Sequence, residues 1–185
     1  MNKERAENAV RELLLALGQN IEAEGLKDTP RRVAEMFIGQ CQGKPAELDR
    51  VFEDHFEGMV IVRDIPFVSC CEHHMVFYSG RAHIAYIPKG KVIGLSKLAR
   101  LVTQCSAGFT IQEKVTEDIA SRIFNEIEGV LGCMVVIEAE HGCMNLRGAR
   151  ATGSSTVTSV VKGVFRDVPA ARAEFMGLVS KGGPR

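Results

Sequence analysis

With 185 residues, the chain is long enough for one domain with a buried core, alone or with a helical addition. Its 23 basic and 23 acidic side chains give a formal net charge of zero. The protein therefore has no net positive electrostatic field to attract nucleic acid or an acidic membrane, and we expect neither of these as a partner. No apolar run approaches the roughly 18 residues of a membrane span and no signal peptide opens the chain, so its six cysteines predict reduced thiols or metal ligands in a cytoplasmic protein.

Two helices are predicted in an N-terminal helical region, residues 1–58. Residues 3–17 carry apolar side chains at helical spacing, and a second helix begins at Thr29-Pro30, with Thr29 as its N-cap. Arg31 and Arg32 fall in the first turn of that helix, where the helix dipole disfavours positive charge. They are either solvated side chains or part of a site in which an anion occupies the helix start.

The remaining residues, 59–185, are expected to form one catalytic domain. Strand 60–68 contains Pro66 and is therefore predicted to be an edge strand or to carry a bulge. The further elements predicted are two strands within 76–87 joined at Ser79-Gly80, helices 96–105 and 111–128, strands 134–141 and 155–165, and a closing helix 169–179. This order predicts an α+β fold with a mostly antiparallel sheet, whose open edges such proteins often close by subunit pairing.

Two distant segments carry the residue types of a metal site. Cys71 and His74 point to the same side only if the chain turns at Glu72-His73, because side chains alternate along a strand. If the strand after residue 134 continues to residue 143, His141 and Cys143 share its core face. We predict that Cys71, His74 and Cys143 bind one metal ion, and two thiolates with an imidazole match zinc.

Three protein ligands leave one position open, as in catalytic zinc sites. The spacing also leaves open a closed structural site, with Cys70, Cys133 or His141 as the fourth ligand. His73 and His141 each lie within two residues of a proposed ligand. Because imidazole titrates near neutral pH, both are candidates for proton transfer.

Four segments together resemble GTP cyclohydrolase I, and the likeness extends over about residues 5–178. In this sequence they read CEHH (71–74), IGLSKLAR (93–100), IQEKVT (111–116) and HGCMNLRG (141–148). The resemblance implies the tunnelling fold (T-fold), a small antiparallel sheet with helices on one face, assembled into a homodecamer with active sites at subunit interfaces. It implies that water activated by zinc adds to carbon 8 of GTP, the imidazole ring opens, formate leaves and 7,8-dihydroneopterin triphosphate forms.

The resemblance also implies roles for individual residues. Cys71, His74 and Cys143 would bind Zn²⁺, His141 would donate a proton to the imidazole ring, and His73 would assist the later proton transfers. The substrate-binding residues implied are Gln112 and Glu113 for guanine, Ser96 for the ribose, and Arg32, Lys97, Arg100 and Arg147 for the triphosphate.

Some of these residues have competing interpretations. Glu113 completes a capping box with Thr110, which uses the same carboxylate, and Ser96 is a candidate N-cap. Lys97 and Arg100 lie on a helix surface, where such side chains are usually solvated, and without the resemblance we would favour that interpretation. Gly142 stands where the family has a bulkier residue, from which we expect a looser approach of Cys143.

Two other functions fit the same motifs. One is another T-fold pterin or deazapurine enzyme, such as a nitrile reductase, which needs a nucleophilic cysteine and no zinc. The other is a T-fold paralogue that binds zinc and nucleotide without turnover.

Overall fold

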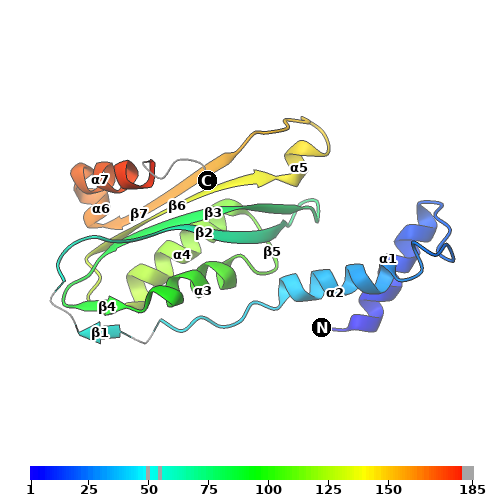
Figure 1. The fold of residues 1–185 in the computed structure, drawn as a ribbon, viewed down its shortest axis with the longest axis horizontal. Coiled ribbons are helices and arrows are strands. Elements are labelled where there is room, and N and C mark those ends of the chain that lie inside the picture. The colour runs from blue at the N-terminus through cyan, green and yellow to red at the C-terminus, as the bar shows by residue number, and fades with distance from the viewer. Residues whose placement is uncertain (49–50, 54–55, 181–185) are drawn as a thin grey trace. The chain divides into compact units, whose positions relative to one another are not determined.

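The computed structural model describes residues 1–48, 51–53 and 56–180 (Figure 1). In chain order the elements are α1 (Lys3–Ala16), α2 (Thr29–Cys41), β1 (Val51–Glu53), β2 (Val60–Cys71), β3 (Phe77–Ile87), β4 (Lys91–Ile93), α3 (Leu95–Cys105), β5 (Phe109–Thr110), α4 (Gln112–Glu126), β6 (Gly132–His141), α5 (Gly142–Asn145), β7 (Thr156–Gly163), α6 (Val164–Asp167) and α7 (Pro169–Ser180). They form two compact units, Met1–Gln42 and Gly43–Arg185. The predicted functional division after residue 58 stays a prediction.

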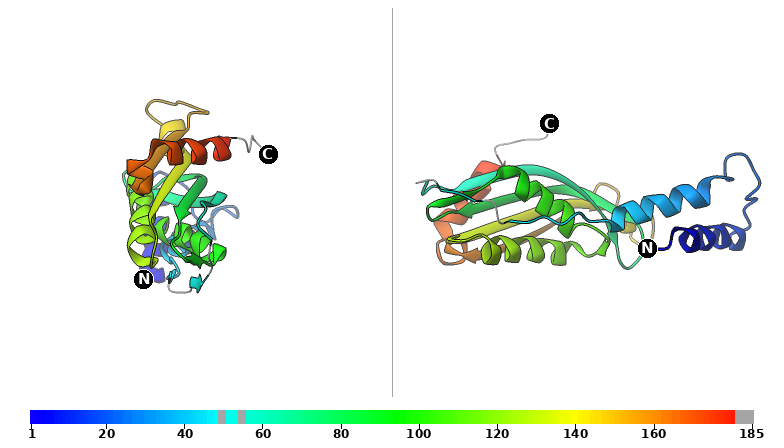
Figure 2. Two further views of the ribbon diagram at one scale, coloured as in Figure 1. Left: turned by 90° about the vertical axis from the view of Figure 1, so that its left-hand side faces the viewer. Right: turned by 90° about the horizontal axis from the view of Figure 1, so that it is seen from below.

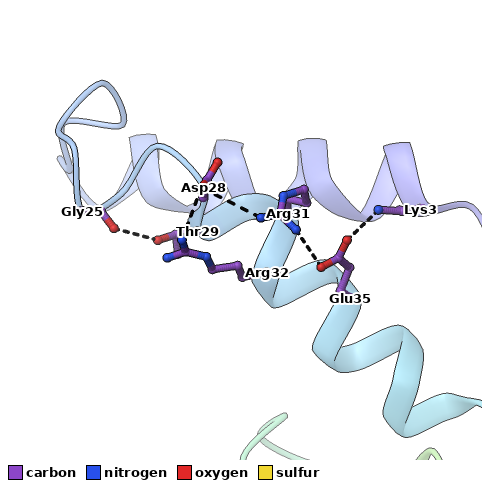
Figure 3. Close-up of polar contacts among 7 residues, drawn as sticks. All are labelled: Lys3, Gly25, Asp28, Thr29, Arg31, Arg32 and Glu35. Carbon is purple, nitrogen blue, oxygen red and sulfur yellow. Dashed lines mark hydrogen bonds and ion pairs between the residues drawn. The ribbon is translucent and has the colours of Figure 1, made fainter.

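The N-terminal unit is a pair of helices. At the start of α1, the Asn2 side chain accepts a hydrogen bond from the backbone N–H of Arg5 at 2.9 Å, which is a side-chain N-cap. Thr29 is predicted to be the N-cap of α2, and this prediction is wrong. Thr29 is the first helical residue, and Asp28 occupies the N-cap position. As a result the Thr29 hydroxyl points backwards and donates to the backbone oxygen of Gly25 at 3.4 Å (Figure 3).

A mixed sheet forms the centre of the second unit. Within the described residues, five strands pair in the order β5-β2-β3-β6-β7, and every neighbouring pair is antiparallel except β2 and β5. The predicted α+β class with a mostly antiparallel sheet is therefore confirmed. A separate two-stranded ribbon joins β1 to β4.

Strand β3 runs unbroken, so the predicted turn at Ser79-Gly80 is wrong. Gly80 pairs with Ala139 of β6, and a Cβ added at Gly80 would lie 1.9 Å from the backbone oxygen of Glu138. The glycine thus permits a close approach between two strands and does not mark a chain reversal.

The prediction for Pro66 is confirmed in both respects. The register between β2 and β3 shifts between Val62 and Ile65, where Asp64 has a φ of 59°. Among the described residues, β5 pairs with β2 only at Cys70 and Cys71, so Pro66 has a hydrogen-bonded strand on one side. A proline, which lacks a backbone N–H, is tolerated there.

Helices pack on both faces of the five-stranded sheet. α3 and α4 pack on one face, over a core that includes Ile84 and Val135. Their neighbours Ala85 and Met134 face the other way and pack with α6 and α7, so the helical cover extends beyond the single face implied by the resemblance (Figure 2). In the part of the chain that the structure describes, no helix combines the length and hydropathy required to span a bilayer.

Candidate active site

The first half of the site is a tight turn that follows β2. The backbone N–H of Met75 donates to the Cys71 oxygen at 2.9 Å, and the Cys71 N–H donates to the Val76 oxygen at 2.9 Å. Met75 completes the reversal with a φ of 55°. The predicted turn at Glu72-His73 is therefore present, and it brings His74 Nδ1 to 4.0 Å from Cys71 Sγ.

The second half does not form as predicted. β6 ends at His141, and the chain enters the short helix α5 at Gly142, with the Leu146 N–H donating to the Gly142 oxygen at 2.9 Å. The expectation of an extended strand as far as residue 143 is therefore wrong. The helical turn nevertheless carries Cys143 to the turn after β2, and the donor atoms of Cys71, His74 and Cys143 all lie within 4.8 Å of one another.

In this chain α5 packs closely against the start of β3 at Gly142. A Cβ at residue 142 would lie 2.4 Å from Val76 Cγ1 and 2.7 Å from the backbone oxygen of Phe77. The expectation that glycine loosens the approach of Cys143 is therefore wrong. Its missing side chain lets α5 lie directly against the start of β3.

The donor set fits a zinc ion. Two sulfur atoms and one imidazole nitrogen are the ligands that zinc prefers, and they come together here from two separate segments. Burial, with the Cys71 thiol nearby, raises the pKa of Cys143, so metal binding at neutral pH must displace a proton.

The residues considered for a fourth ligand have other partners in the described chain. Cys133 is buried, and its thiol donates to the Ala120 oxygen at 3.3 Å. His141 Nε2 lies 2.7 Å from Gln112 Oε1. The metal-competent group of His, Cys, Asp and Glu side chains formed by the described residues has three members, and Cys70 does not join it.

Arg147 contacts the imidazole of the candidate ligand His74. Its Nη1 lies 2.7 Å from His74 Nε2, and because a guanidinium only donates, that nitrogen accepts. A metal ion on Nδ1, the nitrogen near Cys71, would leave a hydrogen on Nε2 of the neutral ring. The Arg147 contact and metal binding at Nδ1 therefore exclude one another.

A cavity of about 220 Å³ opens beside Cys71 and Cys143, two of the three candidate ligands. Six predicted site residues line it: Cys71, Cys143, His73, His141, Gln112 and Glu113. Candidate ligands, proton-transfer groups and hydrogen-bonding groups thus surround one space that is large enough for part of a small molecule.

His141 is held by residues that the sequence analysis missed. Its ring stacks on Tyr78, with centroids 4.5 Å apart and planes 6° apart. The Tyr78 hydroxyl lies 2.6 Å from Thr110 Oγ1, which lies 2.7 Å from Ser69 Oγ. Burial lowers the pKa of His141 and Glu113 opposes this, while burial raises the pKa of Tyr78.

These contacts also decide the capping question. Thr110 is not the N-cap of α4; Ile111 occupies that position, and no side chain caps the helix there. The predicted capping box is wrong because the Thr110 hydroxyl is engaged with Tyr78 and Ser69. The Glu113 carboxylate is therefore not used in a capping box, and Glu113 lines the cavity.

Comparison with known protein families identifies the family to which this chain belongs. The family model described as GTP cyclohydrolase I matches residues 6–180. The chain belongs to the GTP cyclohydrolase I family. Proteins named GTP cyclohydrolase 1 from Carboxydothermus hydrogenoformans and Bacillus subtilis are each 48% identical to it; the first alignment covers 100% of this chain and 98% of the relative, the second 98% and 97%.

Membership in the GTP cyclohydrolase I family confirms the resemblance and the enzyme class expected from it, together with the T-fold. Among solved structures, the archaeosine synthase QueF-Like in the apo form aligns with 57% of this chain and 93% of its own, at a TM-score of 0.46 and 13% identity. That last likeness adds nothing on function.

Three residues that the GTP cyclohydrolase I motifs assign to substrate lie away from the cavity of their own chain. Ser96, Lys97 and Arg100 belong to the first two turns of α3, which begins beside β4, at the end of the sheet away from α5 (Figure 1). Within the described residues they are not part of the cavity lining. Ser96 is also not the helix cap that was predicted, because α3 begins at Leu95 with Gly94 as its N-cap.

Arg32, the remaining residue that the family motifs assign to triphosphate, belongs to the N-terminal unit. Its Nη2 lies 3.3 Å from the Asp28 carboxylate, and Arg31 binds Glu35 at 3.0 Å (Figure 3). The negative charge at this helix start is thus supplied by the protein itself. A phosphate-binding role for Arg32 stays a prediction.

Proposed function

We propose that this protein opens the imidazole ring of GTP and forms 7,8-dihydroneopterin triphosphate and formate, with zinc as its cofactor. The observation that carries the proposal is the convergence of Cys71, His74 and Cys143 beside a cavity that His141 and Glu113 line, in a chain of the GTP cyclohydrolase I family. When bound to these three residues, zinc supplies Lewis-acid activation of water at neutral pH.

The side chains around the cavity suit the remaining tasks. His141 is the proton donor to the imidazole ring of the purine, because it lines the cavity with its ring orientation fixed. His73 is exposed, and its Nδ1 lies 3.8 Å from Cys71 Sγ, so it can exchange protons with both solvent and the site. It serves the later hydrolytic and ribose steps.

Glu113 is the group that recognises guanine. It lies in the first turn of α4, where the helix dipole favours a negative charge. An ionised carboxylate has only acceptors, and it therefore pairs with the ring and exocyclic N–H donors of guanine.

The triphosphate requires positive charge from more than one place. Arg147 lies beside His74, a candidate ligand of the same chain. Lys97 and Arg100 lie one helical turn apart at the other end of the sheet, so we propose that they and Ser96 complete the site of a neighbouring copy. This division supports a homo-oligomer with interfacial active sites, and the family resemblance leads us to expect a decamer.

The expected cellular setting belongs to the same proposal. All six cysteines are free thiols, which agrees with a reducing compartment and hence with the cytoplasm. GTP is the partner that we propose, together with further copies of the chain.

The test is a turnover assay on purified protein. Zinc-loaded protein is incubated with GTP, and formate release and the ultraviolet absorbance of the pterin are followed. We expect both signals, about one zinc per chain, and loss of both signals after chelation with recovery when zinc is restored. Zinc binding without product would instead indicate a nucleotide-binding paralogue. Full activity after complete removal of zinc would overturn the metal assignment.

A further inference from the structure

The side-chain amide of Gln112 is buried, with 1% of the residue exposed, and its orientation is determined by its neighbours. Its Nε2 lies 3.0 Å from the backbone oxygens of Ile137 and Thr156. A backbone carbonyl only accepts hydrogen bonds. The end of the amide that faces β6 and β7 must therefore be the NH₂ group.

A third contact supports the same orientation. Gln112 Nε2 also lies 3.0 Å from Thr158 Oγ1, which lies 2.7 Å from Thr116 Oγ1. The Thr116 hydroxyl donates its single hydrogen to the Gln112 backbone oxygen at 2.8 Å, so the Thr158 hydroxyl must donate to Thr116. Thr158 consequently presents an acceptor to Gln112, as the two carbonyls do.

The orientation of Gln112 determines which nitrogen of His141 carries the hydrogen. With Nε2 of Gln112 facing the strands, its Oε1 is the atom that lies 2.7 Å from His141 Nε2. An amide oxygen only accepts, so His141 Nε2 must be the protonated nitrogen of the neutral ring. Nδ1 carries no hydrogen in the neutral ring, so it is the nitrogen that takes up a proton and then donates it to a bound molecule.

Tyr78 restrains the same ring from its face. The nearly parallel stack at 4.5 Å fixes the plane of the imidazole, while the contact with Gln112 fixes its rotation within that plane. Tyr78 is held in turn by the contact of its hydroxyl with Thr110 at 2.6 Å. Face and edge of His141 are thus held by two different elements, β3 and α4.

We propose that Gln112 is a positioning residue for His141, which fixes the ring so that Nδ1 performs the proton transfer, and that Tyr78 assists it by holding the ring plane. The catalytic part of this inference rests on the proposed function. The inference departs from the guanine-reading role implied for Gln112 by the family motifs, because both ends of its amide already bind protein groups. Base recognition then falls to Glu113.

The direct test measures the tautomer of His141 without turnover. Zinc-loaded protein labelled with ¹⁵N-histidine is examined by solid-state NMR, in which protonated and bare ring nitrogens have different chemical shifts. The His141 signals are assigned by their loss in His141→Asn. We expect neutral His141 to carry its hydrogen on Nε2. A hydrogen on Nδ1 with Nε2 bare would overturn the inference, whether or not the protein converts GTP.

Kinetics then separate positioning from base recognition. Gln112→Met should release the ring, give both tautomers of His141, and lower kcat by about a hundredfold with KM for GTP little changed. Glu113→Gln is the matched comparison; it should raise KM and leave the His141 spectrum unchanged. A raised KM with unchanged tautomer in Gln112→Met would show that Gln112 reads the base, and would overturn the proposal.

A second variant protects the test against misfolding of Gln112→Met. Tyr78→Phe keeps the ring stack and removes only the hydroxyl contact with Thr110. It should lower kcat with KM and the His141 tautomer unchanged, because the edge contact with Gln112 is intact. An unchanged kcat would remove Tyr78 from the proposal. Wild-type protein that forms no product from GTP but shows the Nε2–H tautomer would refute the proposed function and leave the geometry of His141 standing.

Discussion

Replacing Gly142 with alanine tests whether a missing side chain determines the metal site. The added Cβ would lie 2.4 Å from Val76 Cγ1 and 2.7 Å from the Phe77 oxygen, both well inside van der Waals contact. Val76 can shift its side chain, but the Phe77 oxygen belongs to the backbone of β3 and cannot rotate away. Relief therefore requires α5 to move away from β3, and Cys143 moves with it.

The cost follows from the usual penalty for overpacking. An extra methyl group forced into a packed contact costs about 1–3 kcal/mol, and we take about 2 kcal/mol here because one of the two contacts is with backbone. In the metal-free protein, a shift of α5 relieves part of this strain. Metal binding restores the close approach and with it the strain, so zinc affinity should fall by up to about thirtyfold, at tenfold for each 1.4 kcal/mol.

Two measurements check these values. Urea unfolding of the metal-free protein gives the change in stability, and competition with a chelator gives the zinc affinity. Gly177→Ala in α7 is the matched control, because its added Cβ meets no atom within 4 Å. In a double-mutant cycle, Val76→Ala should recover part of the loss in Gly142→Ala and not all of it. If Gly142→Ala matches Gly177→Ala in both stability and zinc affinity, the close approach has no energetic role and the argument is refuted.

Three further predictions address proton transfer, phosphate binding and pH. His141→Ala should retain about one zinc per chain by metal analysis and lose ring opening, whereas loss of zinc would identify His141 as a ligand. Arg147→Ala should weaken binding of GTP by about tenfold or more and of guanosine far less, measured by calorimetry, because a charge-assisted hydrogen bond contributes about 1.5–3 kcal/mol; equal losses would exclude a triphosphate role. Burial lowers the pKa of His83 in the folded protein more than Asp64 and Glu138 raise it, so its contribution to stability is present above about pH 6.5 and is lost as the pH falls through the lower folded value. The free energy of unfolding of His83→Gln should accordingly decrease less between pH 7 and pH 5 than that of the wild type, and parallel profiles would contradict this account.

The sequence was sufficient where local patterns determine structure. Helical periodicity located both N-terminal helices to within a residue or two, and Pro66 correctly indicated an edge with a bulge. The motif around Cys71 and His74 predicted a turn, because its residue types converge only in that way. These features depend on neighbours in sequence, so a single chain is enough to find them.

Contacts between distant segments were the ones missed. Gly80 resembled a turn residue because nothing in its own strand reveals how closely β6 approaches. Thr110 fitted a capping box by spacing, yet its hydroxyl binds Tyr78 across the sheet. The one available signal for Tyr78 was its position opposite His141 in the β3–β6 register, which becomes apparent only once strand pairing is known.

The backbone segments that carry the three candidate ligands differ in how well they are held by neighbouring strands. Cys143 lies in the first turn of α5, two residues after the end of β6, and β6 is flanked by paired strands on both sides. His74 lies in an exposed turn that ends at a residue with positive φ. Local opening starts where few backbone groups are tied down. A metal ion bound at this site should therefore dissociate first from His74 and last from the two sulfur atoms. Hydrogen exchange should show that the turn carrying His74 opens more readily than the segment carrying Cys143.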